Sequence, residues 1–446
     1  MKSQKAKVLH ELGGRPIIAH VVQKALGLQP RKIYVVVGHQ ADKVEAAVLS
    51  EVKNDELVGF PLQREQRGTG HAVMSAREVL RDADSTLLIL SGDVPLVREE
   101  TLRKLVEHHF ASGATCSVLT VKLENPTGYG RVVRDNENRF SRIVEQKDAS
   151  DEEKQIREIN SGIYCFDTRK LFKALDHVQP TNQQQEYYLT DAPAILLASG
   201  EKIELFLIND PREVSGINSR AELAEFENLI RRNAIRSLML AGVTFIDPGH
   251  AYISAMAQIG RDCVIHPDVI IEGACVIGEN CVVRSGSRIS NSRIGDNVTI
   301  KDHCVIVDST VESNCSVGPF AHLRMGAHLE EGSAVGNFVE VKKSRLGRKS
   351  KSMHLTYLGD ATIGAGTNIG AGTVTCNYDG KNKHQTTIGN NVKIGSDTML
   401  VAPVSVGDGA VTAAGSVVTE DVPENSLVAG VPAVVKKKLK KDDGQG

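Results

Sequence analysis

The most regular feature of the chain is an aliphatic side chain at nearly every sixth position from Ile259 to Val418. The step is unbroken at its start, over Ile259, Ile265, Ile271, Ile277, Val283 and Ile289. A six-residue period fits neither the 3.6-residue repeat of a helix nor the alternation of a strand. It predicts a solenoid with one short strand per hexapeptide, three strands per turn, and the aliphatic side chains stacked inside.

Small residues and glycine accompany this period. A small residue often stands two positions before the aliphatic one, as at Ala257, Cys263, Cys275, Cys281 and Ser287. Glycine often follows it, as at Gly260, Gly278 and Gly295. Small side chains suit tight corners, and Gly or Asn suits turns that need positive φ. The pattern resembles that of left-handed parallel β-helix acyltransferases, which predicts this fold for residues 249–435.

The first half of the chain has a different pattern. The aliphatic run Lys32–Val37 ends at Gly38 and precedes a helical pattern over Ala41–Leu49. A second run, Leu87–Leu90, ends at Asp93. Strands that alternate with helices predict a mostly parallel, Rossmann-like α/β sheet in residues 1–217, with ligands bound beyond the carboxyl ends of the strands. Asp93 is placed for such a role, although an Asp after a strand is equally often a turn former.

The two halves are joined by residues 218–248, in which Ser219–Leu240 is predicted to be a helix. Leu223, Phe226, Ile230 and Leu238 form one apolar stripe. Ser219 and Glu222 have the spacing of a capping box. The pattern indicates a connecting helix and implies no chemistry.

Composition limits the possible partners. A length of 446 residues predicts two or three domains. The net charge of −2 does not indicate a basic surface that would bind nucleic acid or an anionic membrane. No apolar run is long enough to span a bilayer, and no signal peptide is visible. The eight Cys show no CxxC pairing, which favours a reducing cytoplasm. Residues 436–446 are expected to be a solvated basic tail.

A candidate site lies where the hexapeptide repeat is interrupted. The repeat falters between Val341 and Ile363, and a polar insertion covers Asn377–His384. Interruptions of a solenoid become loops, where sites gather. The residues near these breaks suit a phosphorylated sugar and comprise Arg324, Lys342, Lys343, His354, Tyr357 and Lys383. Because an imidazole titrates near neutral pH, His354 is the candidate base, with a structural role as the alternative.

Several longer motifs make a family resemblance specific. They are Lys7-Val-Leu-His10, Gln66-Arg-Gly-Thr-Gly-His71, Pro126-Thr-Gly-Tyr-Gly-Arg131, Gly336-Asn-Phe-Val-Glu340, His354-Leu-Thr-Tyr-Leu-Gly-Asp360 and Cys376-Asn-Tyr-Asp-Gly380. From about Lys5 onward the chain resembles the bifunctional bacterial family that makes UDP-N-acetylglucosamine, a precursor of cell-wall polymers. The resemblance implies acetyl transfer from acetyl-CoA to glucosamine-1-phosphate, and uridylyl transfer from UTP to N-acetylglucosamine-1-phosphate.

The resemblance assigns the acetyl-transfer site to the β-helix. It makes His354 the base and places a set of residues on the sugar phosphate or the substrate edge: Arg324, Lys342, Tyr357, Asn368, Asn377, Tyr378 and Lys383. The acetyl-CoA groove is assigned to Ala371, Asn377, Tyr378, Ser396 and Ala414. Backbone N–H groups near Ala371 and Ser396 are expected to meet the developing oxyanion. The chain lacks the Arg that the family often carries near the end of the coil, so Lys436–Lys438 would have to serve there.

The resemblance also assigns a uridylyl-transfer site. Lys7 would meet phosphate, and Gln63, Gly68 and Thr69 would hold the uracil end. Ser91 and Gly92 would line the nucleotide-sugar site, in which Asp93 and Asn218 bind Mg²⁺ and Gly130, Glu145 and Asn160 hold N-acetylglucosamine. Plainer alternatives exist, since Asn218 suits a helix cap and Gly68 a simple turn.

The start of the chain departs from the family pattern. Met1-Lys2-Ser3 stands where the family has the end of a first strand and Gly-rich loop that cradles the triphosphate. As written, the sequence therefore predicts weak or absent uridylyl transfer beside competent acetyl transfer. Two explanations are open: a chain that begins at an internal Met, or an N-terminal half that keeps only a structural role.

The flat faces of a triangular coil predict a homotrimer with acetyl-transfer sites at subunit junctions. Three alternatives for function remain: an acetyltransferase with a degenerate N-terminal half, a related sugar-1-phosphate nucleotidyltransferase, or a non-catalytic scaffold. Retention of Asp93, Asn218 and His354 disfavours the scaffold. The spacing of His266, His303, His322 and His328 supports no metal site in the β-helix.

Overall fold

A computed structural model of the protein describes residues 1–80 and 83–439. The chain divides into two compact units, Met1–Phe226 and the part from Glu227 onward, with the division inside helix α8 (Arg220–Leu240). The predicted capping box is confirmed, because Glu222 N–H donates to Ser219 Oγ (3.1 Å) and Ser219 N–H donates to Glu222 Oε2 (2.8 Å). Among the described residues, no helix has the length and apolar content needed to cross a membrane.

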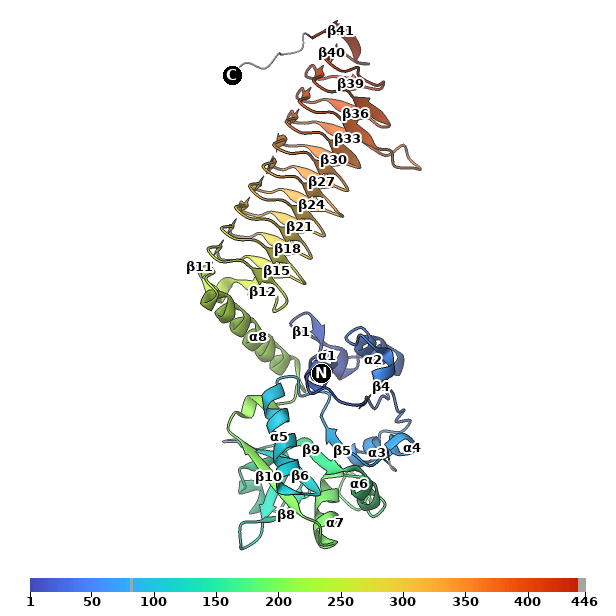
Figure 1. Ribbon diagram of the computed structural model, residues 1–446, viewed down its shortest axis with the longest axis vertical. Helices are drawn as coiled ribbons and strands as arrows, with labels where there is room; N and C mark the ends of the chain where they lie inside the picture. Colours follow the sequence, from blue (N-terminus) through green and yellow to red (C-terminus); the bar gives the residue numbers. More distant parts are fainter. Residues whose placement is uncertain (81–82, 440–446) are drawn as a thin grey trace. The chain divides into compact units, whose positions relative to one another are not determined.

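The first unit is built on a six-stranded sheet (Figure 1). Its strands are β10 (Ile203–Ile208), β6 (Cys116–Lys122), β9 (Glu158–Asp167), β7 (Arg131–Arg134), β8 (Phe140–Val144) and β5 (Thr86–Ile89). The α/β class is confirmed, but the sheet is mixed rather than mostly parallel. β10 is parallel to β6, whereas β9 is antiparallel to β5, β6 and β7. The reason is that the chain returns through the β7–β8 hairpin and runs β9 back between β5 and β6.

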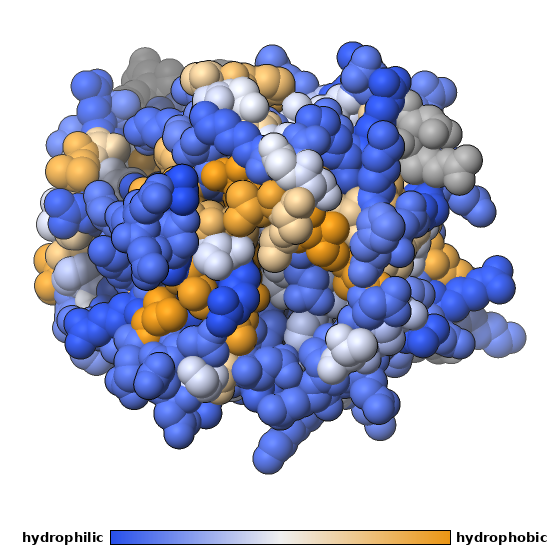
Figure 2. Space-filling view, turned by 90° about the horizontal axis from the view of Figure 1, so that it is seen from below, coloured by the Kyte–Doolittle hydropathy of each residue, from blue (hydrophilic) through white to orange (hydrophobic). Residues whose placement is uncertain are grey.

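Helices accompany these strands, and a short parallel pair, β3 (Ile33–Tyr34) with β4 (Val58–Gly59), forms a separate sheet. The helices are α1 (Ile17–Gly27), α2 (Ala41–Leu49), α3 (Thr69–Met74), α4 (Arg77–Leu80), α5 (Glu99–Ser112), α6 (Thr168–Leu175) and α7 (Ala192–Ala198). The predicted helix over Ala41–Leu49 is confirmed as α2. The face shown in Figure 2 is mostly hydrophilic, with apolar residues gathered in patches.

The second unit is the predicted solenoid, from β11 (Thr244–Phe245) to β41 (Val434–Lys438). Its strands stack into three sheets of twelve, ten and nine members, which we call the first, second and third sheets in that order. The first corner joins the first sheet to the second, the second corner joins the second to the third, and the third corner leads back to the first. Paired strands of consecutive coils are parallel and in register. The hand of the coil remains a prediction.

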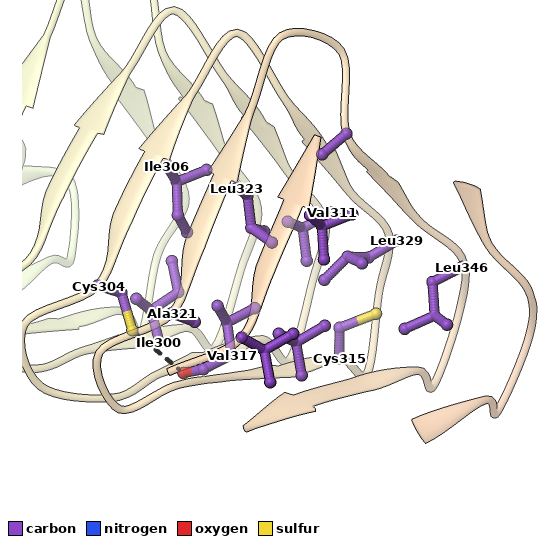
Figure 3. Close-up of a cluster of buried hydrophobic side chains, with 14 of the residues drawn as sticks. Ile300, Cys304, Ile306, Val311, Cys315, Val317, Ala321, Leu323, Leu329 and Leu346 are labelled. Carbon is purple, nitrogen blue, oxygen red and sulfur yellow. Dashed lines mark hydrogen bonds between the residues drawn. The ribbon is translucent and has the colours of Figure 1, made fainter. Parts of the chain in front are cut away.

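The repeated aliphatic side chains fill the inside of the coil, as predicted. Figure 3 shows this stacking for Ile300, Ile306, Val311, Val317 and Leu323. The glycines that follow the aliphatic residues have a different role from the predicted one. Gly260 is not in the positive-φ region, but a Cβ added there would lie 2.6 Å from Gly278 O of the next coil. These glycines therefore permit close stacking of coils.

The C-terminal end corrects the expectation of a basic tail over 436–446. Lys436–Lys438 belong to β41, which pairs antiparallel with β40 (Ser426–Ala429). Gly430, at φ +105°, lets the chain reverse between the two strands. The three lysines are exposed, and residues 440–446 of the predicted tail lie outside the described part of the chain.

Candidate active sites

His354 is the last residue of β29 (Lys351–His354) and stands exposed at the first corner. Its Nδ1 lies 2.8 Å from Oδ1 of Asn337, the last residue of β26 (Ala334–Asn337) and its in-register neighbour one coil earlier. Because an amide oxygen only accepts hydrogen bonds, Nδ1 carries the proton in this arrangement. The lone pair of Nε2 is then free to accept a proton from a substrate.

Ala371, Ser396 and Ala414 follow His354 along the same corner. Asp397 N–H donates to Ala371 O (2.7 Å) and Gly415 N–H donates to Ser396 O (2.8 Å), which links consecutive coils. The N–H groups of Ala371, Ser396 and Ala414 themselves donate to no acceptor within residues 1–80 and 83–439. Three of the five predicted groove residues thus form a column of free backbone donors next to the candidate base, whereas Asn377 and Tyr378 lie at the second corner.

Cationic side chains gather at the second corner. Arg324 and Lys342 end the paired strands β24 (His322–Arg324) and β27 (Glu340–Lys342) and lie in register. Arg324 Nε donates to Glu340 Oε1 (2.7 Å), while Lys342 is only 8% exposed. A hydrogen bond and charge repulsion from Lys342 lower the pKa of Lys383. Two ammonium groups held this close favour an anion between them.

The polar insertion also lies at the second corner, between β33 (Val374–Cys376) and β34 (Thr386–Ile388). Its first residue, Asn377, is buried and donates through Nδ2 to Asp360 Oδ2 (2.6 Å). Tyr378 is exposed and pairs across the loop with Lys383. The structure therefore brings Asn377, Tyr378 and Lys383 together with Arg324 and Lys342.

The remaining predicted residues, Tyr357 and Asn368, lie on two different faces of the coil, and only the second sheet connects the first corner with the second. Tyr357 begins β30 (Tyr357–Gly359) on the second sheet, and Asn368 begins β32 (Asn368–Ile369) on the first. In the described part of one chain, no hydrogen bond or ion pair connects His354 with the second-corner cations. The base and the phosphate-binding group thus occupy neighbouring corners of the coil.

In the first unit, Lys7, Asp93 and Asn218 meet at one point. Lys7 Nζ donates to Asn218 Oδ1 (2.6 Å) and forms an ion pair with Asp93. Asp93 O also accepts from Ile217 N–H (3.1 Å), which fixes the loop that carries Asn218. A carboxylate and an amide oxygen therefore converge on a cation, and hard oxygen donors of this kind suit Mg²⁺.

A second group in this unit contains Gly130, Glu145 and Asn160. Asn160 N–H donates to Gly130 O (2.9 Å), and a Cβ on Gly130 would lie 3.3 Å from Glu145 Oε1. Burial is the main cause that raises the pKa of Glu145, and the charges of Asp148 and Asp191 raise it further. The loop is thus held close to a carboxylate that protonates more readily than an exposed one.

Ser91 and Gly92 lie between these two groups. Ser91 Oγ donates to Gly162 O (3.4 Å), which ties the end of β5 to β9 beside Asn160. A Cβ on Gly92 would lie 3.2 Å from Ile18 Cδ1, so a larger residue would press on helix α1. Both predicted residues therefore lie where the loop after β5 passes over the sheet.

A third group contains Gln63, Gly68 and Thr69. Gln63 Nε2 donates to Gly68 O (3.3 Å), and Leu189 N–H donates to Thr69 Oγ1 (3.1 Å). Gly68 has φ +104°, and a Cβ there would lie 2.6 Å from Tyr187 O. Glycine is thus required at this position by both conformation and space.

Sequence reasoning missed residues that complete these groups. Asn337, Glu340 and Asp360 each contact a predicted site residue, namely His354, Arg324 and Asn377. Two of them could have been found from their spacing in the sequence. Asn337 and Asp360 each lie 17 residues, about one coil of the solenoid, before the residue they contact. Asp148 and Asp191, close to Glu145, left no comparable signal.

Comparisons with known proteins show the family to which the chain belongs. Residues 2–210 match the nucleotidyl transferase family, residues 248–350 match the GMPPB C-terminal domain, and residues 385–420 match the bacterial transferase hexapeptide family. The bifunctional protein GlmU of Syntrophomonas wolfei is 48% identical over 427 residues, which cover 96% of this chain and 94% of that protein. GlmU of Heliobacterium modesticaldum is 47% identical over 440 residues, 99% of this chain and 93% of that protein.

GlmU of a Geobacillus species is 46% identical over 427 residues, again 96% of this chain and 92% of that protein. Identity of this size over nearly the full length of both partners is far above what a shared fold alone produces. The predicted resemblance and the predicted bifunctional transferase are confirmed, and the chain belongs to the family of the bifunctional protein GlmU.

Proposed function

We propose that the β-helix, residues 249–435, transfers the acetyl group of acetyl-CoA to glucosamine-1-phosphate. The sugar amine attacks the thioester carbonyl carbon, so that a C–N bond forms and the C–S bond breaks. His354 Nε2 takes the proton that the amine loses, and the thiolate of coenzyme A leaves. The free N–H groups at Ala371 and Ser396 are placed to stabilise the oxyanion. The single observation that carries the proposal is the Asn337-oriented imidazole of His354.

The residues at the second corner are proposed to bind the phosphate group of glucosamine-1-phosphate. Lys342 and Lys383 are held close enough to depress the pKa of Lys383, and Arg324 keeps its NH1 group free of Glu340. A phosphate monoester between them would offset this repulsion, while a neutral sugar would not. The same second corner would therefore select glucosamine-1-phosphate over glucosamine.

The first unit, residues 1–217, is proposed to transfer uridylyl from UTP to N-acetylglucosamine-1-phosphate, with residues 218–248 as the connection. An oxygen of the sugar phosphate attacks the α-phosphorus of UTP, and the bond to pyrophosphate breaks. Asp93 and Asn218 would hold Mg²⁺ at the point where the Lys7 ammonium now meets them. Bound Mg²⁺ would offset the negative charge of the phosphates. Gln63, Gly68 and Thr69 would hold the base, and Gly130, Glu145 and Asn160 the sugar.

Removal of the metal separates the two activities. Any pyrophosphate that the full chain releases from UTP and N-acetylglucosamine-1-phosphate with Mg²⁺ should appear at least about tenfold more slowly in EDTA, because the phosphates lose their counter-ion. Acetyl transfer, measured as thiol release from acetyl-CoA, should not change with EDTA. Pyrophosphate release that persists in EDTA would contradict the metal site, and failure of thiol release in either buffer would contradict the proposed acetyl transfer.

The raised pKa of Glu145 gives a pH dependence. Below that pKa the carboxyl becomes neutral and loses its charge-assisted hydrogen bonds to sugar hydroxyls, so affinity for UDP-N-acetylglucosamine should fall as pH decreases towards 5. Because the folded chain binds this proton at higher pH than the unfolded chain, Glu145 alone makes stability rise as pH falls through its folded pKa. Titration calorimetry between pH 5 and 8 should show a flatter profile for Glu145→Gln, and an unchanged profile would contradict this assignment.

A homotrimer with shared acetyl-transfer sites is part of the proposal. Positive-φ positions at the third corner carry Asp262, Asn280, Asn297 and Asn314, residues suited to that conformation. At the first corner the same positions carry His303, Phe320, Phe338 and Leu355. The His303 and Phe320 rings stack at 5.2 Å, as do those of Phe320 and Phe338, and Phe338 is 56% exposed.

An exposed apolar column of this kind marks a contact surface, and it ends beside His354. A convex corner cannot enclose a small ligand, whereas a second copy of the chain can cover it. The second corner of that copy, with the loop that projects from the coil near β33 (Figure 1), would bring phosphate-binding cations to the base. A cytoplasmic location is proposed as well, because all eight cysteines are free.

A further inference from the structure

The polar insertion closes as a tight hairpin. Tyr378 and Lys383 form an antiparallel bridge, and His384 N–H donates to Asn377 O (2.8 Å) at the base of the hairpin. The turn is formed around Gly380, at φ +97°. Tyr378 and Lys383 were both predicted to bind the substrate. The hairpin holds them opposite each other, one on each of its two arms.

Asp379 holds this hairpin together from within. Its Oδ1 accepts from Lys381 N–H (2.8 Å) and Asn382 N–H (2.7 Å), and its Oδ2 lies 2.7 Å from His384 Nε2. The N–H of Asn382 and the imidazole hold the pKa of Asp379 well below its ordinary value, so the carboxylate stays ionised at neutral pH. Because an ionised carboxylate only accepts, the imidazole N–H is the donor.

This bond acts against a repulsion in the site. Lys383 lies close enough to Lys342 for the like charges to depress the pKa of Lys383, and this force pushes the hairpin away from the coil. Asn377 ties one strand of the hairpin to Asp360 on the coil. The strand that carries Lys383 is held by its pairing with Tyr378 and by the side chain of the next residue, His384, bonded to Asp379.

We propose that His384, through its bond to Asp379, is a positioning residue for acetyl transfer that holds the Lys383 ammonium against the sugar phosphate. The inference rests on the proposed binding of glucosamine-1-phosphate at the second corner. His384 does not touch the reacting atoms in this scheme, and the proton still goes to His354. Loss of the bond should therefore weaken substrate binding and leave the chemical step in place.

Steady-state kinetics of the full chain test this role. His384→Ala should raise KM for glucosamine-1-phosphate about tenfold, the equivalent of one charge-assisted hydrogen bond, with kcat within about twofold and KM for acetyl-CoA unchanged. His384→Gln should recover part of the loss, because its amide can donate to Asp379. A melting temperature equal to that of the unchanged chain shows that the coil is intact.

Two further variants separate the possible failures. Lys381→Ala is the matched control, since this exposed side chain makes no hydrogen bond or ion pair among the described residues, and it should leave both KM values unchanged. Lys383→Ala should raise KM for glucosamine-1-phosphate, and adding His384→Ala to it should cause no further rise. If Lys383→Ala has no effect, the proposed phosphate site is wrong. If Lys383→Ala acts but His384→Ala does not, or lowers kcat instead, only the positioning role is overturned.

Discussion

Replacement of His354 by alanine is expected to reduce kcat for acetyl transfer by roughly two to four orders of magnitude, the usual contribution of a positioned general base. The imidazole is exposed, and its only hydrogen bond among the described side chains is the one to Asn337, so the coil should fold without it. What is lost is the acceptor for the proton of the sugar amine. Uridylyl transfer by the same preparation should stay unchanged, because His354 lies in the second unit.

The matched control for His354→Ala is His328→Ala. His328 lies on the third sheet and pairs with Glu312 (2.8 Å), a surface contact that contributes about 1 kcal/mol or less to stability. Thiol release from acetyl-CoA should distinguish the two variants. Equal rates for His354→Ala and the unchanged chain would show that His354 is not the base. A large loss in His328→Ala would show that loss of a surface contact, and thus of folding, is enough to lower the rate.

The solenoid could be predicted from the sequence because its buried side chains recur every six residues, and the aliphatic residues of the sequence show the same spacing. Each buried aliphatic residue, such as Ile265 or Val317, occupies the same place in its own coil, so one rule repeats many times. The direction of β9 could not be predicted in the same way. It depends on where the β7–β8 hairpin returns the chain, and the sequence of Glu158–Asp167 has no feature that separates a parallel strand from an antiparallel one.

The candidate sites were predicted as sets of residues, and their geometry was not. Family motifs place Lys7, Asp93 and Asn218 in one site although 211 residues separate the first from the last. The partition of the acetyl-transfer residues between two corners depends on which strand of each coil ends at Lys342 or at His354. The coils in this region differ in length, because Ala334 pairs with Lys351, 17 residues on, whereas Asn368 pairs with Lys393, 25 residues on. Counting hexapeptides therefore does not show at which corner a residue lies.

The column at the first corner leads to the second large prediction. Phe338→Asn should convert a trimer, three times the chain mass of 48.2 kDa, into monomers, because it removes the exposed last ring of the stack, the one nearest His354. Acetyl transfer should fall at least about a hundredfold, since displacement of catalytic groups by even 1 Å costs that much. Light scattering gives the mass, and thiol release gives the rate.

The choice of asparagine separates assembly from folding. Phe338 has φ +55°, a conformation that costs most side chains about 1 kcal/mol and that asparagine tolerates, so the isolated coil should lose no stability. Lys349→Asn makes the same exchange at a third-corner position with φ +57° and should leave mass and rate unchanged. A Phe338→Asn chain that stays trimeric would show that the aromatic column does not hold the subunits together. A monomer with full acetyl-transfer rate would show that each chain carries a complete site. The base at the first corner and the phosphate-binding cations at the second corner of one chain would then act on the same substrate.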